Sequence, residues 1–279
     1  MKRRNRPLQA ALVYTAYIVA TVLALIPILW VISTSFKLTT ELFVVPPHWI
    51  PQHPTLENYR FVLFGSPIPR MFLNSVIVAL LTVVLNLAFA TVAAYAFSRF
   101  PIRRKTGWLL VLLGTQLIQG VANTIPLYVM MRSLGLLDTI WALILIYSAA
   151  NLPFSIWILK ATFDSVPAAL DEAAMIDGCS RFGAFRRVVL PLVGPGLLAA
   201  GTMVVVNAWS EFFLALMLTS SQASRTIATG MFLFQGQYGM SAWNLVSAAA
   251  VVATIVPLLL FAFFQNAMVG GLSRGAVKG

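Results

Sequence analysis

The chain has 279 residues, of which 59% are hydrophobic and only 10% are charged, and its mean hydropathy is +0.87. A soluble fold of this length could not bury so much apolar surface, so the composition indicates an integral membrane protein and excludes an ordinary soluble domain. The net charge of +11 would suit nucleic acid only if the basic residues gathered on one water-exposed face, and their distribution along the chain argues against that.

Six mostly apolar runs reach the length of about 20 residues that a membrane-spanning helix needs. In chain order they are Ala11 to Ile32, Phe72 to Ala96, Trp108 to Met130, Ile140 to Leu159, Leu197 to Leu218 and Leu245 to Phe264. The first run follows the basic stretch MKRRNR and is too long for the apolar part of a secretory signal, so we expect a retained helix. The sequence therefore predicts an all-α integral membrane protein with six transmembrane helices.

Basic residues in the connections predict the orientation of these helices. Fourteen of the nineteen Lys and Arg residues fall on one side of the spans, the side that also carries both termini. The positive-inside rule places that side in the cytoplasm, so both the N and C termini are expected to be cytoplasmic. The high isoelectric point is then largely a signal of topology, which removes the argument for nucleic-acid binding.

The densest group of charges lies in the cytoplasmic connection 161–196, in the stretch DEAAMIDGCSRFGAFRRVVLPL. Good helix formers after Pro167 predict a short amphipathic helix. We expect one of its sides to carry Leu170, Ala173, Ala174 and Asp177, with Asp171 and Glu172 off the edge. Gly178 suits a chain reversal with positive φ, Ser180 can cap a second helix, and Pro191 is expected to end it. Such a helix pair could dock another protein or rest on lipid.

Polar residues recur at helical spacing within three of the predicted spans. They are Gln116, Gln119 and Asn123 in the third, Ser148, Asn151 and Ser155 in the fourth, and Asn207 with Glu211 in the fifth. An ionisable residue such as Glu211 costs about 3 kcal/mol at membrane depth on insertion scales, so it is a functional hypothesis by default. These stripes could line a transport pathway or could join helices through hydrogen bonds.

No group of residues in the sequence predicts catalysis or metal binding. Cys179 is the single cysteine, and His48 and His53 share one proline-rich outer loop with Glu57, which is a weak basis for a metal site. No convincing pair of nucleophile and base is present. The chain also has no GxxxxGK[ST] phosphate loop. We therefore expect no catalytic residue, no metal and no cofactor bound by this chain.

Several segments resemble binding-protein-dependent ABC importer permeases. EAAMIDG from Glu172, followed after nine residues by VVLP, is similar to the EAA loop of that family. Five other segments resemble the sugar-permease branch of the family, the maltose-type inner-membrane subunits. They are AYAFSRF from Ala94, IPLYVMMRSLGLLDT from Ile125, LPFSIWILKATFDSVP from Leu152, AWSEFFLALMLT from Ala208 and the tail GGLSRGAVKG. The stretch FPIRRKTG departs from the family, which often has a glycine near this basic cluster.

The resemblance implies the type I ABC importer permease fold, with one transmembrane permease domain over residues 1–279 in a prokaryotic inner membrane. It also implies that the EAA loop, residues 161–196, is a coupling loop that docks on a cytoplasmic ATPase. The residues that would carry this coupling are Glu172, Ala173, Ala174, Gly178, Leu190 and Pro191. The expected partners are two copies of an ABC ATPase, a second permease subunit, an extracytoplasmic solute-binding protein and membrane lipid. ATP and Mg would be bound by the ATPase, and this chain would not itself be an enzyme.

The implied function is import of a carbohydrate or polyol, which the solute-binding protein delivers and ATP hydrolysis on a separate subunit drives. The alternative is a secondary transporter or channel for a small polar solute, which would need neither an ATPase nor the charged loop. The candidate pathway residues are Gln116, Gln119, Asn123, Asn151, Asn207 and Glu211. In the outer connection 220–244, the candidate binding-protein contacts are Phe234, Gly236, Gln237 and Tyr238, although these aromatic residues would also suit an interfacial belt.

Overall fold

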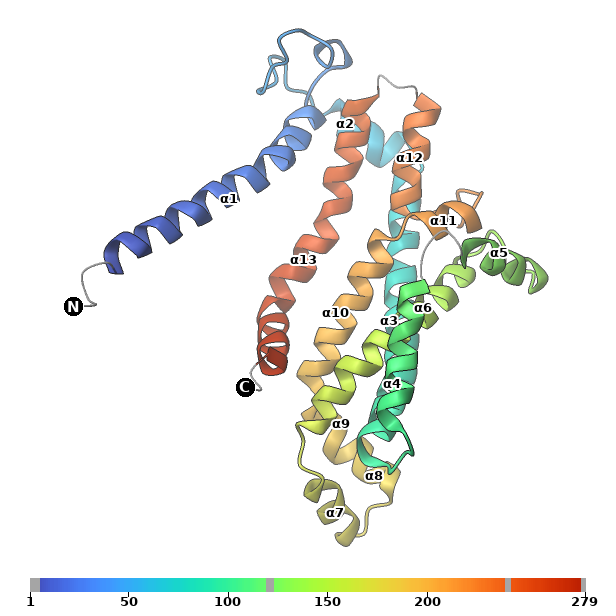
Figure 1. Ribbon diagram of the computed structural model, residues 1–279. Coiled ribbons are helices and arrows are strands. Elements are labelled where there is room, and N and C mark those ends of the chain that lie inside the picture. Colours follow the sequence, from blue (N-terminus) through green and yellow to red (C-terminus); the bar gives the residue numbers. More distant parts are fainter. Residues whose placement is uncertain (1–5, 119–122, 239–241, 277–279) are drawn as a thin grey trace. The chain divides into compact units, whose positions relative to one another are not determined.

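The computed structural model describes residues 6–118, 123–238 and 242–276, without the side chains of residues 6–9, 11, 118, 233–238 and 264–276. Within these ranges all regular structure is helical, which agrees with the predicted class (Figure 1). The chain forms two compact units. Unit 1 comprises Met1–Pro69 and Met231–Ile255, and unit 2 comprises Arg70–Gly230 and Val256–Gly279.

Unit 1 contains α1 (Arg6–Ser35), α2 (Glu57–Arg60) and the first part of α13 (Trp243–Ala276). Two buried asparagines close the segment between α1 and α2 onto the start of α13. The Asn58 amide donates to the carbonyls of Ser35 and Lys37, both at 2.9 Å, and the Asn244 amide donates to the Asn58 side-chain oxygen at 2.9 Å. Because these amides satisfy backbone groups that have no helical partner, they hold an irregular segment in one conformation.

Unit 2 contains the long helices α3 (Ile68–Arg99), α6 (Ile140–Asp164) and α10 (Gly194–Ser210), together with the shorter α4 (Lys105–Gly114), α5 (Thr124–Ser133) and α11 (Phe213–Leu218). Glycines on α10 allow close helix packing. A Cβ atom at Gly196 would lie 2.4 Å from the hydroxyl oxygen of Thr162 on α6, and one at Gly201 would lie 3.3 Å from Leu87 on α3. Small residues at such crossings are typical of packed membrane helices.

Within the part of the chain that the structure describes, four helices are long and apolar enough to cross a membrane, and a bent pair, Arg181–Leu192 with Gly194–Ser210, provides a fifth candidate. The remaining predicted span, Trp108 to Met130, is divided: α4 ends at Gly114, a 3-10 turn covers Thr115–Ile118, and α5 begins at Thr124. The Thr115 hydroxyl donates to the Leu112 carbonyl at 2.7 Å, a local bond that competes with helix continuation. The predicted span Leu197 to Leu218 is also interrupted, between α10 and α11.

The cytoplasmic connection contains α7 (Ala169–Ile176), α8 (Arg181–Ala184), a π-helical turn Phe185–Val189 and α9 (Leu190–Leu192). Gly178 has a φ of +88°, and the Ser180 hydroxyl accepts the Gly183 N–H at 3.1 Å, so the predicted reversal and cap are confirmed. Pro191 does not end the segment as expected. The helix passes through it to Leu192, and the chain turns at Val193, where φ is −89° and ψ is 7°.

The outer connection 220–244 is more regular than the sequence predicts, because it contains α12 (Ile227–Tyr238). The Ile227 N–H donates to the Ser75 hydroxyl of α3 at 2.8 Å, and Thr229 is fully buried. The Asn74 amide of α3 also donates to the carbonyls of Ala223 and Arg225, at 3.0 and 2.9 Å. The segment before α12 is therefore attached to α3 through backbone groups rather than left free.

Candidate functional site

Asp171 joins α7 to the cytoplasmic end of α3, near the end of unit 2 where α7 and α8 lie (Figure 1). The Tyr95 hydroxyl donates to one carboxylate oxygen at 2.7 Å, and the Arg99 Nε donates to the other, also at 2.7 Å. Arg99 donates in addition to the Val166 carbonyl at 2.8 Å. The side chains of Arg99 and Asp171 are 12% and 8% exposed, so this ion pair is largely shielded from water. α7 is thus held by a buried, charge-assisted contact.

This position of Asp171 corrects the expected face of the helix. Asp171 and Ala174 are buried, whereas Leu170 and Ala173 are exposed. The buried face of a helix usually carries apolar side chains. Here the hydrogen bonds from Tyr95 and Arg99 compensate the cost of burying the Asp171 carboxylate. Hydrophobic periodicity could not identify this residue, since the compensating groups lie more than 70 residues away in the sequence.

Aromatic side chains form the surface against which the connection packs. The ring of Phe185 lies 4.7 Å from that of Tyr95, and Phe163 lies 5.7 Å from Tyr95, measured between centroids. Phe163 and Val189 are fully buried and Phe185 nearly so. The connection therefore belongs to the hydrophobic core of unit 2, which also includes residues of α3, α6 and α10. A displacement of the turn Phe185–Val189 would have to disturb this core.

The opposite side of the connection is open. Ile176 is 86% exposed and Phe182 is 68% exposed, both unusual for large apolar residues. Among the six predicted coupling residues, those on the accessible side are Glu172, Ala173, Gly178 and Pro191. Leu190 is half-buried and Ala174 faces the core. Glu172, Ala173, Gly178 and Pro191 are thus each accessible to a partner, whereas Ala174 is placed to let α7 approach the bundle.

Gln116, Asn151 and Asn207 form hydrogen bonds that connect separate helical segments. The Gln116 amide donates to the Ala150 carbonyl of α6, and the Asn207 amide donates to the Asn151 side-chain oxygen, both at 2.8 Å. Asn123 directly precedes α5, and Gln119 lies outside the described residues. These contacts agree with the expectation that polar stripes join helices, and the pathway role stays a prediction.

Glu211 forms the break between α10 and α11. Its backbone is extended, with ψ of 121°, and its carboxylate accepts the N–H groups of Leu214 at 2.9 Å and Ala215 at 3.1 Å. The Tyr147 hydroxyl of α6 donates to the same carboxylate at 2.6 Å. The side chain therefore caps α11 and connects it to α6, which explains how an acidic residue can lie at this depth.

Asp138, which the sequence did not single out, fixes the other end of α11. It accepts the N–H groups of Ser220 at 2.7 Å and Ser221 at 2.8 Å and the hydroxyl of Ser224, and its own N–H donates to the Leu218 carbonyl at 2.9 Å. Burial disfavours the charged carboxylate, but these hydrogen bonds outweigh it and hold the pKa of Asp138 well below its usual range. The carboxylate's partners Ser220, Ser221 and Ser224 lie more than 80 residues away, so no local pattern reveals this role.

The candidate binding-protein contacts Phe234, Gly236, Gln237 and Tyr238 belong to the backbone of α12, but their side chains lie outside the description. Their role stays a prediction. Among the described residues there is no group of three or more His, Cys, Asp or Glu side chains that could hold a metal ion.

Apolar helices of membrane-spanning length, with a connecting helix pair packed into the core of unit 2, are compatible with a membrane permease. The family model of the binding-protein-dependent transport system inner membrane component matches residues 4–274, so the chain belongs to that family. It is a multi-pass protein of the inner membrane and the permease subunit of an importer. This membership favours the importer over the secondary transporter or channel.

Relatives and solved structures agree with the assignment. The chain is 39% identical to the sulfoquinovosyl glycerol transport system permease protein of Agrobacterium fabrum over 94% of this chain and 93% of that protein. It is 34% identical to the trehalose/maltose transport system permease protein of Thermococcus litoralis over 99% of both. The crystal structure of a bacterial ABC transporter involved in alginate import contains a chain that matches with a TM-score of 0.78 and 22% identity, over 95% of this chain and 98% of that one. The fold is that of a type I ABC importer permease.

Proposed function

We propose that this protein is one of two permease subunits of an importer for a carbohydrate or polyol, and that ATP hydrolysis on a separate pair of ATPase subunits drives it. The solute would arrive on an extracytoplasmic binding protein, and ATP with Mg would be bound by the ATPase. The second permease subunit would be a different chain. The single observation that carries the ATPase part of the proposal is the docking of α7, which is anchored on one side by Asp171 and exposed on the other.

The anchoring supports a coupling role because it makes the connection a stiff link. A force on the exposed side of α7 would reach α3 through the Asp171 contacts with Tyr95 and Arg99. It would reach α6 and α10 through the packing of Phe163, Phe185 and Val189. Packed cores transmit such displacements because they deform little. An interfacial helix pair resting on lipid would need neither the buried ion pair nor the core position.

The residues on the exposed side of α7 and α8 favour contact with a protein partner over exposure to water. Small Ala173 permits close approach of another backbone, Ile176 and Phe182 offer apolar area, and Glu172 offers a charge that a basic or polar group of the ATPase could meet. Gly178 would hold the bend that presents these residues together.

The carbohydrate part of the proposal rests on the relatives named above, whose described solutes are sugars or sugar derivatives. The pair Asn151 and Asn207, together with Gln116, which bonds to α6, and Glu211, which directly follows α10, supplies amide and carboxylate groups of the kind that bind hydroxyls. We propose that Gln116, Gln119, Asn123, Asn151, Asn207 and Glu211 contribute to the pathway. Phe234, Gly236, Gln237 and Tyr238 are proposed to contact the binding protein.

The first experiment is a mild-detergent pull-down of the tagged protein, with mass spectrometry of the chains that co-purify. We expect an ATPase, a second permease and a solute-binding protein, whose bound ligand would identify the solute. Recovery of this chain alone, from a preparation in which known complexes survive, would contradict the proposal.

The second experiment tests the docking surface. Glu172→Lys should leave membrane insertion at the wild-type level but abolish solute uptake by reconstituted proteoliposomes, because it reverses the charge at the proposed contact. Glu57→Lys, an exposed charge reversal on the outer side, is the matched control and should transport normally. Normal uptake and normal ATPase binding by Glu172→Lys would refute this docking surface.

A further inference from the structure

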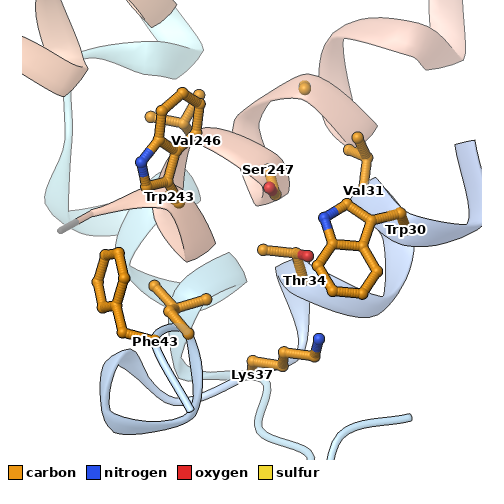
Figure 2. A pocket seen from close by; sticks show the side chains of 10 residues that line it. Trp30, Val31, Thr34, Lys37, Phe43, Trp243, Val246 and Ser247 are labelled. Carbon is orange, nitrogen blue, oxygen red and sulfur yellow. The ribbon is translucent and has the colours of Figure 1, made fainter. Parts of the chain in front are cut away.

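A pocket of about 320 Å³ lies within unit 1, between the end of α1, the segment after it and the first turns of α13. Figure 2 shows Trp30 and Val31 on one side, Trp243 and Phe43 on the other, and Thr34 and Ser247 between them. Leu42, Val246 and Ala250 complete the apolar lining, and Lys37 closes the pocket next to Thr34. Because the N terminus is cytoplasmic, the end of α1 lies on the outer side, where a spanning helix meets the lipid headgroups.

Lys37 is a buried cation without a salt bridge. It is 2% exposed, its Nζ donates to the His48 carbonyl, and its ammonium lies 4.2 Å from the centroid of the Trp30 ring. Neither ion pair in the described part of the chain includes it. The nearby acid Glu41 directs its carboxylate to the N–H groups of Gln52 and His53, at 3.2 and 2.9 Å. Burial lowers the pKa of Lys37, and the more distant charge of Glu41 opposes this shift only in part.

The same pocket contains one buried hydroxyl group without a partner and a second hydroxyl group that forms no hydrogen bond with a described residue. The Thr34 hydroxyl oxygen is buried and has no hydrogen-bond partner, although the residue is only 6% exposed. The Ser247 hydroxyl forms no hydrogen bond with any described residue, and Ser247 is 7% exposed. Buried polar groups are almost always paired, and buried charges are paired or compensated. Lys37, whose one hydrogen bond goes to the His48 carbonyl, and the Thr34 and Ser247 hydroxyls line one pocket, and together they suit a ligand with several acceptor oxygens and a negative charge.

We propose that this pocket binds a phospholipid of the outer leaflet, with its phosphate oxygens accepting hydrogen bonds from Lys37, Thr34 and Ser247. Apart from these three residues the lining is apolar, which suits the glycerol backbone and the upper part of an acyl chain better than a sugar. The Trp residues at the rim are typical of the membrane–water interface. The exposed apolar surface of α1, from Leu12 to Ile32, would continue the contact with the chain. This inference is independent of the transported solute.

The test is native mass spectrometry of the complete purified transporter, titrated with phosphatidylglycerol in detergent. Two other probes are a galactosyl diacylglycerol with the same acyl chains and inorganic phosphate. We expect phosphatidylglycerol to bind at one site that neither the galactolipid nor millimolar phosphate occupies. Thr34→Val, which preserves the shape of the side chain, should weaken binding on the order of tenfold, Ser247→Ala similarly, and Lys37→Gln should abolish it. Arg132→Gln, which removes an exposed outer cation, is the matched control and should bind as the wild type does.

Each alternative occupant has its own signature. Equal binding of the galactolipid would mean that the acyl chains alone occupy the pocket. Displacement of the lipid by free phosphate would identify a soluble-anion site. Displacement of the lipid by a neutral disaccharide such as maltose would identify a sugar site. Each result would overturn the proposal, as would unchanged lipid binding in Thr34→Val. Because Lys37 also supports the loop through His48, Thr34→Val is the decisive variant if Lys37→Gln does not assemble.

Discussion

Asp171→Ala is the substitution that tests most directly how α7 is held. It removes the acceptor of both Tyr95 and Arg99 and leaves the Arg99 guanidinium in a site where it is 12% exposed. Breaking one side of a buried ion pair costs about 3–5 kcal/mol, because the remaining charge is not solvated. An eight-residue helix such as α7 has little stability of its own. The loss therefore should appear as local undocking of α7, with the undocked population raised by about two to four powers of ten.

Hydrogen exchange of the complete complex, followed by mass spectrometry of peptides that cover residues 168–180, measures this population. We expect faster exchange of α7 in Asp171→Ala, with unchanged exchange in α6, and a loss of solute uptake at normal membrane insertion. Glu172→Ala is the control on the exposed side of the same helix and should leave exchange of the isolated permease unchanged. Tyr95→Phe, which removes one hydrogen bond to a charged group, should show a smaller effect of about 1.5–3 kcal/mol. Equal protection of α7 in wild type and Asp171→Ala would refute the anchoring argument.

Four further experiments test other parts of the fold. Gly178→Val forces a β-branched residue into a φ of +88°, which strains the reversal by about 1–2 kcal/mol; uptake should fall while insertion stays normal, and a fully active variant would remove the argument for the bend. Gly196→Ala places a Cβ atom 2.4 Å from Thr162 and should lower stability by about 1–3 kcal/mol in thermal unfolding in detergent, whereas Gly194→Ala, with no atom within 4 Å, should not. The pKa of Asp138 is lower in the folded state than its unfolded value of about 3.9. The stabilisation by this carboxylate is therefore complete above about pH 3.9 and is lost as the pH falls through the folded-state pKa. Asp138→Asn should lower the melting temperature at pH 7, and an equal melting temperature would contradict the role of its hydrogen bonds. Cysteines at Gln116 and Asn123 should react with water-soluble thiol reagents if this stripe lines a cavity, and uniform inertness would assign it to helix packing.

Several local features could be read from the sequence because their causes are local. The apolar runs require helices in a membrane, since every backbone polar group must be satisfied inside the segment. The bias of basic residues determines the orientation. The reversal at Gly178 and the cap at Ser180 depend on one residue type at one position, and both are present in the structure. The EAA stretch also indicated the family, because its residues stand close together in the chain.

The continuity of the helices was harder to predict. Hydropathy treats Leu197 to Leu218 as one span, but the Glu211 carboxylate supplies acceptors for the first N–H groups of α11 and allows the helix to restart. At Pro191 the prediction failed in the opposite direction. A helix end was expected at this proline, but the helical segment accommodates it after the π-helical turn Phe185–Val189. In both cases a nearby polar group or backbone adjustment overrides the average tendency of the residues.

The sequence by itself determined the class of protein, the apolar segments that form its main helices, its orientation and the position of the EAA-like cytoplasmic connection. Only the tertiary structure decided which polar residues are buried and what they hold. Asp171 meets Tyr95 and Arg99 of α3, and Asp138 meets the segment after α11, across more than 70 residues in each case. A carboxylate is stable in a buried position only when donors reach it there. Whether they do depends on helix packing between distant segments, which no local pattern records.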